Sequence, residues 1–426
     1  MLQDLKSGSL VAPTRICILG GGFAGLYTAL YLDRLSWSKG KKPEITLIDQ
    51  KDRFLFTPFL YELITEELQT WEVAPSFQKL LMDTDVQFNQ GTVKGIDLRE
   101  NQIQLQDSPP LFYDYLVLAV GRRSYSDAVP GVSTHAYAFR TLADAMRLQE
   151  KLHILENSNL SKIRVGIIGG GANAVELAGK LVDRLGKRGE IFLIVRGQKI
   201  LKNFSNRCQK TAYKSLISRG VRVKFETKVE VLYEDCLTLT QGDQIHTIPV
   251  DLVIGTMGTQ AREWLHFLDC KHNNRGQLLT QPTLQLLDYP EVFALGDLAD
   301  IRDRRGEQIP TTAQAAFQQA NCAAKNLKSA IEKRRLKAFH YLHLGQMLTL
   351  GIHAATVSSF GIELKGFPAC IGRKCVYILL RMPTISHRYE VVCYRLKRLS
   401  IKTFRLFIQG WGKGFSRFRK ALSFFI

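Results

Sequence analysis

The chain has 426 residues, of which 45% are hydrophobic and 23% are charged. These proportions are those of a globular protein, and the length exceeds what one ordinary core organises, so we expect two or three domains. The formal net charge of +19 leaves nucleic acids, anionic membranes and acidic ligands as candidate partners. Because the sequence has no run of about 18 apolar residues, we expect no membrane-spanning helix.

The first predicted element is an apolar strand, Arg15–Leu19, which leads into a glycine turn and then into a helix over 23–35. In the turn, Gly20, Gly22 and Gly25 would let the backbone approach a pyrophosphate. The helix N-terminus adds free N–H groups and a positive dipole end. This arrangement is typical of a dinucleotide-binding site.

A second buried strand, Glu44–Asp49, completes a βαβ unit and ends in an acid. Asp49 follows Gly25 at close to the ~20-residue spacing at which a carboxylate binds a ribose diol. Strand, helix and terminal acid together predict that the unit binds a dinucleotide. The alternative is a tight packing turn that holds no ligand.

The same device recurs later in the chain. Strand Arg164–Ile168 leads into a second turn, in which Gly169, Gly171 and Ala174 occupy the positions of the three glycines of the first turn. One turn binds one dinucleotide, so two copies indicate that the chain brings two cofactors together. We expect a nicotinamide donor and a flavin.

A further pattern follows each turn, namely an aspartate, an apolar strand and a closing glycine. It covers 113–121 after the first turn and 250–258 after the second, so that Gly121 and Gly258 close the two strands. This internal repeat predicts two similar α/β modules.

The second module departs from the first at the end of its second strand, predicted over 190–197. Val195 and then Arg196 stand where an acid would bind the ribose 2′-hydroxyl. A carboxylate would repel a 2′-phosphate, whereas arginine offers that phosphate two donors. We therefore predict a preference for NADPH, with NADH as the weaker donor. The alternative is an exposed arginine at a strand end.

Later, the apolar strand 290–297 delivers Gly296 and Asp297 to the edge where open α/β sheets bind ligands. A helix rich in alanine and glutamine is predicted to begin near 309–312. Gln314 and Gln318 lie four residues apart, on one face of this helix.

These motifs, in this order, resemble those of the type II NAD(P)H:quinone oxidoreductases, which are flavoproteins with two dinucleotide-binding domains. The resemblance covers roughly residues 14–385 and is strongest to the cyanobacterial and plastid branch that includes demethylphylloquinone reductases. It implies that the first turn, Asp49 and Asp297 hold FAD, with Asp297 on the ribityl chain. It also implies that Thr57 and Pro58 lie against the isoalloxazine.

The resemblance implies an activity as well. Hydride would pass from NADPH to FAD and then to a membrane quinone, best identified as demethylphylloquinone. Glu176 would lie near the nicotinamide and flavin, and Gln314 and Gln318 near the flavin and quinone. Two alternatives remain open: a respiratory-type NADH dehydrogenase that reduces plastoquinone or ubiquinone, and a flavin-bound redox sensor.

The fold implied is α/β, with two Rossmann-like domains. We expect an FAD domain over 12–125 and 279–340, interrupted by an NAD(P) domain over 126–278. A C-terminal segment, 341–426, would form the quinone entrance and dock the membrane. The sequence leaves the oligomeric state open, with a homodimer among the candidates.

The cysteines and histidines carry little chemistry. The eight cysteines include no C-x-x-C, which disfavours a disulfide reductase, and we interpret them as buried thiols. The paired reactive cysteines of sulfide oxidation are not evident either. His340, His343 and His353 fit no strong ligand motif, so no metal site is predicted.

Residues 395–426 contain no acid, and their apolar residues recur in steps of three and four. With basic residues on the opposite side, this pattern predicts a helix lying in an anionic membrane interface. We therefore expect a peripheral protein on the cytoplasmic or stromal face of a thylakoid or plasma membrane. One alternative is a helix packed on the protein's own core. The other is a basic and aromatic clasp for nucleic acid, which the periodic stripe disfavours.

Overall fold

The computed structural model describes residues 12–38, 42–124, 129–359 and 362–398. The chain divides into two compact units, Met1–Cys370 and Ile371–Ile426, and each is described by itself. Most of the predicted tail helix, residues 399–426, lies outside the described residues.

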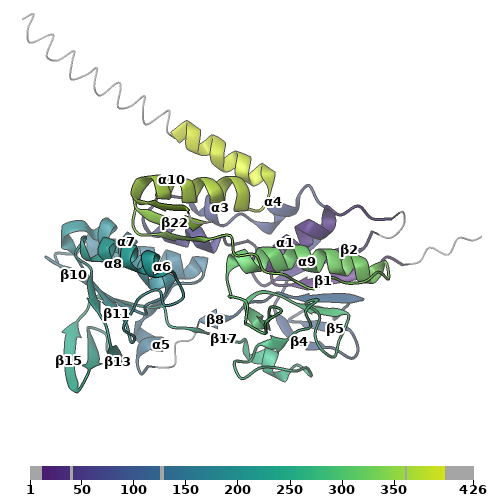
Figure 1. Cartoon of the computed structure of the whole chain (residues 1–426), viewed down its shortest axis with the longest axis horizontal. Coiled ribbons are helices and arrows are strands. Elements are labelled where there is room, and N and C mark those ends of the chain that lie inside the picture. The colour runs from purple at the N-terminus through teal and green to yellow at the C-terminus, as the bar shows by residue number, and fades with distance from the viewer. Residues whose placement is uncertain (1–11, 39–41, 125–128, 360–361, 399–426) are drawn as a thin grey trace, which may run out of the picture. The chain divides into compact units, whose positions relative to one another are not determined.

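The first unit contains two five-stranded parallel sheets (Figure 1). The first sheet has the order β19-β7-β1-β2-β3, in which all neighbouring strands are parallel. Its strands are β1 (Arg15–Leu19), β2 (Glu44–Asp49), β3 (Val86–Gln90), β7 (Tyr115–Leu118) and β19 (Val292–Ala294). The late strand β19 therefore returns to a sheet that is otherwise built by the first part of the chain.

Apolar runs explain why this sheet is buried on both faces. Ile16, Ile18 and Leu19 of β1 are fully buried, as expected for a parallel sheet that helices cover. Helices α1 (Phe23–Asp33) and α9 (Ala313–Ile331) pack against one another along this part of the molecule (Figure 1). The many alanines of α9 allow this close packing.

The second sheet has the order β12-β11-β10-β16-β9 and is also parallel throughout. Its strands are β9 (Tyr137–Ala138), β10 (Ile163–Ile168), β11 (Gly189–Ile194), β12 (Arg222–Lys224) and β16 (Leu252–Gly255). The longer helices of this half are α6 (Leu142–Glu156), α7 (Ala172–Leu185) and α8 (Asn206–Ile217).

Smaller sheets complete the first unit. Two are three-stranded and antiparallel: β4 (Val93–Asp97) with β5 (Gln102–Leu105) and β6 (Leu111–Phe112), and β13 (Thr227–Leu232) with β14 (Cys236–Gln241) and β15 (Gln244–Pro249). A third antiparallel sheet joins β21 (Gln346–Thr349), β22 (Ala355–Ser359) and β23 (Ile362–Lys365). Two pairs remain: β8 (Arg123–Ser124) with β17 (Thr259–Gln260), and β18 (Leu278–Leu279) with β20 (Ala299–Asp300).

Short helices link these sheets. The α-helical ones are α2 (Leu60–Ile64), α3 (Thr70–Val73), α4 (Phe77–Leu81) and α5 (Val132–His135). Single 3₁₀ turns cover Thr57–Phe59, Gly186–Arg188, Glu263–Phe267 and Gly296–Leu298.

Helix α10 (Gly366–Val376) crosses the boundary between the units, and the second unit continues with a π-helical turn, Tyr377–Arg381, and a helix over 385–398. The described part of this second unit exposes several large apolar side chains, with exposed fractions from 48% to 74%: Ile371, Leu379, Leu380, Ile385, Tyr389 and Leu396. In the described part of the chain, no helix combines the length and the hydropathy needed to cross a membrane.

The two βαβ units form as predicted. Strand β1 matches its predicted limits, and α1 ends at Asp33, two residues before the expected Leu35. Strand β11 ends at Ile194, so Val195 and Arg196 follow the strand instead of ending it. The α/β class with two parallel sheets is confirmed.

Candidate functional site

The first glycine turn joins β1 to α1, and the fold itself requires two of its glycines. Gly20 has a φ of +99°, and a Cβ on it would lie 2.5 Å from the carbonyl oxygen of Ala119. A Cβ on Gly25 would lie 1.8 Å from the Gly20 oxygen. Gly22 differs, because its φ is −74° and a Cβ there would meet none of the described atoms within 4 Å. Nothing in the described fold therefore explains Gly22, whereas a ligand lying on the helix N-terminus would.

The second glycine turn, between β10 and α7, likewise has one glycine that the fold requires and one that it does not. Gly169 has a φ of +138°, and a Cβ on it would lie 2.2 Å from Oγ1 of Thr256. Gly171 has a φ of −82° and faces open space among the described residues, as Gly22 does. Ala174 is fully buried in the first turn of α7. Both turns thus keep one glycine at the helix N-terminus that packing does not demand.

Asp49 ends β2 beside the first turn. Its carboxylate accepts hydrogen bonds from the backbone N–H of Gly21 at 2.6 Å and of Lys51 at 2.9 Å. The predicted ribose-binding acid therefore lies directly at the turn that would hold the pyrophosphate.

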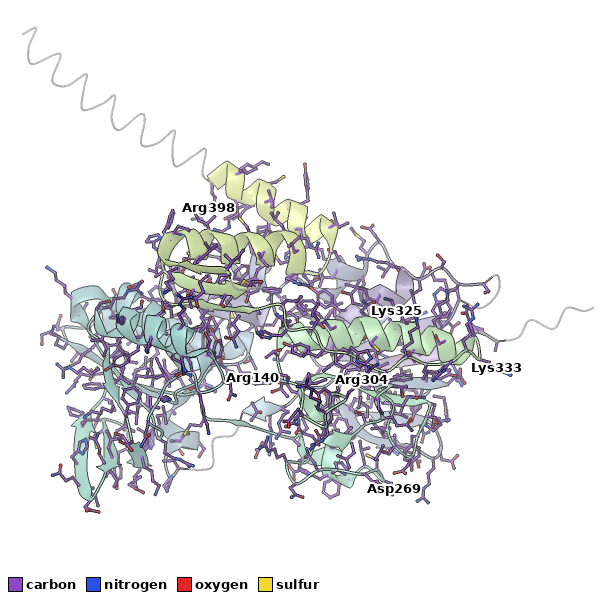
Figure 2. The ribbon with its side chains drawn as sticks, in the orientation of Figure 1. Arg140, Asp269, Arg304, Lys325, Lys333 and Arg398 are labelled. Carbon is purple, nitrogen blue, oxygen red and sulfur yellow. The ribbon has the colours of Figure 1, made fainter. Side chains whose placement is uncertain are left out.

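Gly296 and Asp297 reach the same edge from the other end of the sheet. A Cβ on Gly296 would lie 3.6 Å from the Cβ of Ala24, which places the end of β19 at the start of α1. The backbone N–H of Gly296 donates to Oε1 of Gln319 on α9 at 2.8 Å. The Asp297 carboxylate pairs with the Arg140 guanidinium at 3.3 Å, and Figure 2 labels the position of Arg140.

Several arginines lie near Asp49 and Asp297, and the sequence interpretation missed them. Burial lowers the pKa of the Arg262 guanidinium, and the nearby cations Arg140 and Arg123 lower it further, while Asp49 opposes the shift. The Arg262 Nε donates to the carbonyl oxygen of Val120 at 3.1 Å. A cation kept in this environment favours a bound anion.

Arg122 extends this arginine group. Burial lowers its pKa as well, with Arg140 and Arg275 adding to the shift and Asp297 opposing it. Its guanidinium donates to the carbonyl oxygens of Thr259 at 3.1 Å and of Arg275 at 3.2 Å. The group comes from segments far apart in the chain, and the one local signal was the pair of arginines that follows Gly121.

Gly121 and Gly258 lie where the chain crosses between the two halves of the first unit. Both have positive φ values, +62° and +46°. Gly258 directly precedes β17, and Gly121 lies two residues before β8, in the antiparallel pair in which Arg123 faces Gln260 and Ser124 faces Thr259. The repeated pattern of strand and closing glycine thus marks the two crossings.

Thr57 and Pro58 open a 3₁₀ turn that an aromatic cluster holds against the first helix. Phe23 of α1 contacts Phe54, Phe56 and Phe317, with ring centroids between 5.2 and 5.5 Å apart. These rings fix the stretch that carries Thr57 and Pro58 against α1, which packs on α9 through Phe317. Sequence patterns gave no indication of the roles of Phe23 and Phe317.

A hydrogen bond joins this stretch to the second glycine turn. The Tyr61 hydroxyl donates to Oδ1 of Asn173, in the first turn of α7, at 2.8 Å. One turn further along α7, Glu176 is buried, and its Oε1 accepts from the backbone N–H of Thr349 at 2.9 Å. The structure therefore brings Glu176, the stretch 57–61 and the second turn into one region.

Val195 and Arg196 follow β11 at the carboxyl edge of the second sheet. The backbone N–H of Val195 donates to the carbonyl oxygen of Lys224, and the Arg196 side chain is exposed. Nearby, Nε2 of Gln198 donates to Oε1 of Glu226 at 2.9 Å. An exposed guanidinium here is accessible to a phosphate group.

Gln314 and Gln318 direct their amides at one backbone segment. Oε1 of Gln314 accepts from the Tyr341 hydroxyl at 2.8 Å and from the Leu344 N–H at 3.0 Å. The Gln318 amide exchanges two hydrogen bonds with the backbone of Leu342, both of 2.8 Å. Both glutamines thus hold the segment 341–345 that leads into β21.

The chain matches the model of the pyridine nucleotide-disulphide oxidoreductase family over residues 14–320. Over 384 residues it is 46% identical to the demethylphylloquinone reductase NdbB of Synechocystis sp., covering 89% of this chain and 95% of the relative. It is 38% identical to a chloroplastic/mitochondrial alternative NAD(P)H-ubiquinone oxidoreductase of Arabidopsis thaliana, covering 88% of this chain and 79% of that protein.

Among solved structures, the fold is similar to that of NDH2 from Plasmodium falciparum in complex with NADH. The TM-score is 0.80 at 20% sequence identity, and the match covers 89% of this chain and 96% of the other.

Proposed function

The chain belongs to the pyridine nucleotide-disulphide oxidoreductase family and, within it, to the type II NAD(P)H:quinone oxidoreductases, and we propose that it is an FAD-dependent NADPH:quinone reductase acting at a membrane surface. The observation that carries the two-cofactor assignment is the pair Gly22 and Gly171. Each stands at the N-terminus of the helix after a parallel strand, and each faces open space among the described residues. A pyrophosphate lying against each helix N-terminus explains both.

The residues around the first turn fit FAD. Gly20, Gly22 and Gly25 would receive its pyrophosphate, while Asp49 would bind the ribose and Asp297 the ribityl chain. Arg262 and its neighbouring arginines supply positive charge at the same edge. The stretch with Thr57 and Pro58 would lie against the isoalloxazine. When bound, the flavin accepts hydride from the nicotinamide and passes two electrons to the quinone.

The second turn would receive the exchangeable nicotinamide cofactor at Gly169, Gly171 and Ala174. We propose NADPH as the preferred donor, because Arg196 offers an exposed guanidinium where a carboxylate would repel the 2′-phosphate. Gly121 and Gly258 would border the cofactors where the chain crosses between the FAD part, 12–125 and 279–340, and the NAD(P) part, 126–278.

Glu176 is proposed to act beside the nicotinamide and the flavin, because α7 carries it one turn beyond Asn173. For Gln314 and Gln318 we propose a role at the quinone side, exerted through the segment 341–345 that their amides hold. The segment 341–426 would complete the quinone entrance.

The proposed substrate is a prenylated naphthoquinone such as demethylphylloquinone. The name of the Synechocystis relative supports it, because that protein is 46% identical over most of both chains. The Arabidopsis relative, named as a ubiquinone oxidoreductase, favours a benzoquinone as the second candidate.

A quinone panel tests the function. Purified, flavin-loaded protein is mixed with NADPH or NADH and with demethylphylloquinone, plastoquinone or ubiquinone analogues, and kcat/KM is measured for each pair. We expect rapid turnover, highest for NADPH with the naphthoquinone. Turnover highest with a benzoquinone would select the second candidate. Flavin reduction without quinone-dependent turnover would instead identify a redox sensor.

A further inference from the structure

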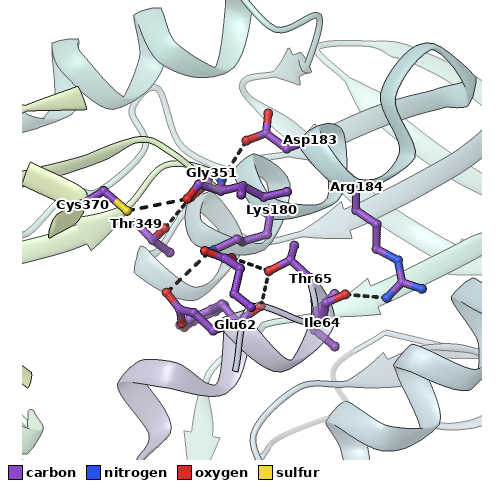
Figure 3. A network of polar contacts seen from close by, with 12 residues as sticks. Glu62, Ile64, Thr65, Lys180, Asp183, Arg184, Thr349, Gly351 and Cys370 are labelled. Carbon is purple, nitrogen blue, oxygen red and sulfur yellow. Dashed lines mark hydrogen bonds and ion pairs between the residues drawn. The ribbon is translucent and has the colours of Figure 1, made fainter. Parts of the chain in front are cut away.

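A lysine side chain is fully buried between two glutamates where α7 meets α2 (Figure 3). Lys180 and Glu62 have side chains that are 0% exposed, and that of Glu67 is 11% exposed. The Lys180 Nζ lies 3.5 Å from Oε1 of Glu62 and also contacts Oε2 of Glu67. We call these three residues the Lys180 triad.

The triad joins the two sides of the proposed reaction centre. Glu62 and Glu67 follow the stretch that carries Thr57 and Pro58, so they belong to the flavin side. Lys180 lies on α7, whose N-terminus is the second glycine turn, and it comes one turn after Glu176. A single ammonium therefore connects the flavin-side stretch to the helix that would receive the nicotinamide cofactor.

Neighbouring contacts hold the glutamates in place. The Thr65 hydroxyl donates to Oε2 of Glu67 at 2.5 Å, and the Glu67 N–H donates to the Glu62 carbonyl oxygen at 2.9 Å. One turn beyond Lys180, Arg184 donates to the carbonyl oxygen of Ile64 (Figure 3). Lys180 and Arg184 thus attach two successive turns of α7 to the segment 62–67.

An adjacent face of α7 is also fixed. A Cβ on Gly179 would lie 2.4 Å from the carbonyl oxygen of Leu350, so the helix and the 349–352 backbone approach closely. Oδ2 of Asp183 accepts from the Ile352 N–H at 2.8 Å (Figure 3). Because α7 is held on this side, the triad determines where the flavin-side stretch lies relative to the helix.

A buried ion triad is an unusual way to join two helices. Removing charged groups from water costs more than burying apolar ones, and well-packed apolar side chains often replace buried ion pairs without loss of stability. The charges instead constrain the position of α7 relative to the segment 62–67, because the ammonium must stay within reach of both carboxylates. Hydride transfer benefits from such a constraint, since its rate depends on ångström-scale alignment of donor and acceptor.

We propose that Lys180 is a positioning residue that, through Glu62 and Glu67, sets the alignment of the nicotinamide on α7 with the flavin against the 57–58 stretch. This inference rests on the proposed function. It assigns to Lys180 a role in hydride transfer that is exerted through other side chains.

Anaerobic stopped-flow reduction of the bound flavin by NADPH, without quinone, isolates that step. We expect Lys180→Met to slow flavin reduction at saturating NADPH by about tenfold or more, with the Kd for NADPH changed less than about threefold. With NADPH deuterated at the transferred position, the slowed step should keep a primary isotope effect. The matched control Arg164→Met removes an ion pair with Asp251 (2.8 Å) at the opposite end of β10. It should leave the rate unchanged.

Lys180→Met removes the ammonium that contacts two carboxylates in the interior, so loss of stability must be separated from misalignment. In the variant Lys180→Met/Glu62→Gln/Glu67→Gln, the charges are absent together. We expect this variant to recover the thermal midpoint of the wild type but to keep the slow hydride transfer. Recovery of the wild-type rate would overturn the inference, as would a wild-type rate in Lys180→Met. If the wild-type flavin is not reduced by NADPH at all, the proposed function fails, and the inference with it.

Discussion

At the residue scale, the glycines of the two turns separate into those that the fold requires and those that a ligand explains. The fold excludes a side chain at Gly20, Gly25 and Gly169, because φ is positive there or because a Cβ would clash with neighbouring atoms. Neither reason applies to Gly22 and Gly171. The sequence motif treats all of these glycines alike, because it records spacing and not surroundings.

Arg196 carries the proposed cofactor preference by itself. A charge-assisted pair with the 2′-phosphate is worth about 1.5–3 kcal/mol, which corresponds to roughly 10- to 150-fold in affinity. We therefore expect Arg196→Ala to lower kcat/KM for NADPH by about tenfold or more and to leave that for NADH nearly unchanged. Steady-state kinetics with both donors measure this ratio.

The control for this prediction is Lys214→Ala, which removes an exposed cation from α8. It should leave the ratio of the two donors as in the wild type. If Arg196→Ala lowers kcat/KM for NADPH and for NADH equally, the arginine attracts both cofactors as anions and does not distinguish the 2′-phosphate.

The interpretation of the cysteines as buried thiols is confirmed for Cys17, Cys208 and Cys370 and is wrong for Cys375, which is exposed; the remaining four are partly buried. Burial raises the pKa of Cys17, Cys208, Cys270 and Cys322 to about 11. Such thiols carry little thiolate at neutral pH and are poor nucleophiles. The activity proposed here accordingly uses none of them.

At the scale of elements, the parts predicted from the sequence were those with local causes. Strand β1 and the turn after it are encoded within about ten residues, by an apolar run and glycines at fixed spacing. The arginine group is different, because Arg140 and Arg262 come from distant segments to lie near Asp297 and Asp49. Lys180 is also different, since its position within an α7 pattern of apolar residues gives no sign of its partners Glu62 and Glu67 on and after α2.

The end of α6 offers a pH-dependent test of how the helices are joined. The Arg184 guanidinium hydrogen-bonds Glu156 at 2.7 and 2.8 Å and lowers the pKa of its carboxyl group, with His153 and Arg188 adding to the effect. Because the folded-state pKa lies below that of the unfolded chain, the stabilisation is present at neutral pH. It is lost as the pH falls through the folded-state pKa.

We therefore expect Glu156→Gln to lower the free energy of unfolding by about 1–2 kcal/mol at pH 7, because Arg184 loses its anionic partner. The difference from the wild type should shrink towards zero as the pH falls below the folded-state pKa of Glu156. Urea midpoints measured across this pH range test it. Glu150→Gln, at an exposed position of the same helix, should show no such pH dependence. A constant difference at all pH values would contradict an ionic origin.

At the scale of the whole molecule, charge and exposed apolar surface both occur towards the C-terminus. Residues 395–426 contain no acid, and residues 371–398 expose Leu379, Leu380 and Ile385. The sequence predicted a membrane-docking helix in the tail, and the part over 399–426 stays a prediction because it lies outside the described residues. The sequence interpretation missed the exposed apolar side chains of 371–398, although Ile385, Tyr389 and Leu396 recur at helical spacing.

We expect the tail to supply the electrostatic part of membrane binding. Each basic residue near an anionic surface contributes about 1 kcal/mol, so deleting 395–426 removes several kcal/mol of attraction. The truncated protein should co-sediment weakly with vesicles rich in anionic lipid, whereas the full chain should bind them and dissociate as salt is raised. Vesicles of neutral lipid are the control, and the truncation should weaken binding to them less than binding to anionic vesicles. Activity with a water-soluble quinone should persist after truncation. Unchanged binding to anionic vesicles would instead place the anchor in the exposed apolar residues of 371–394.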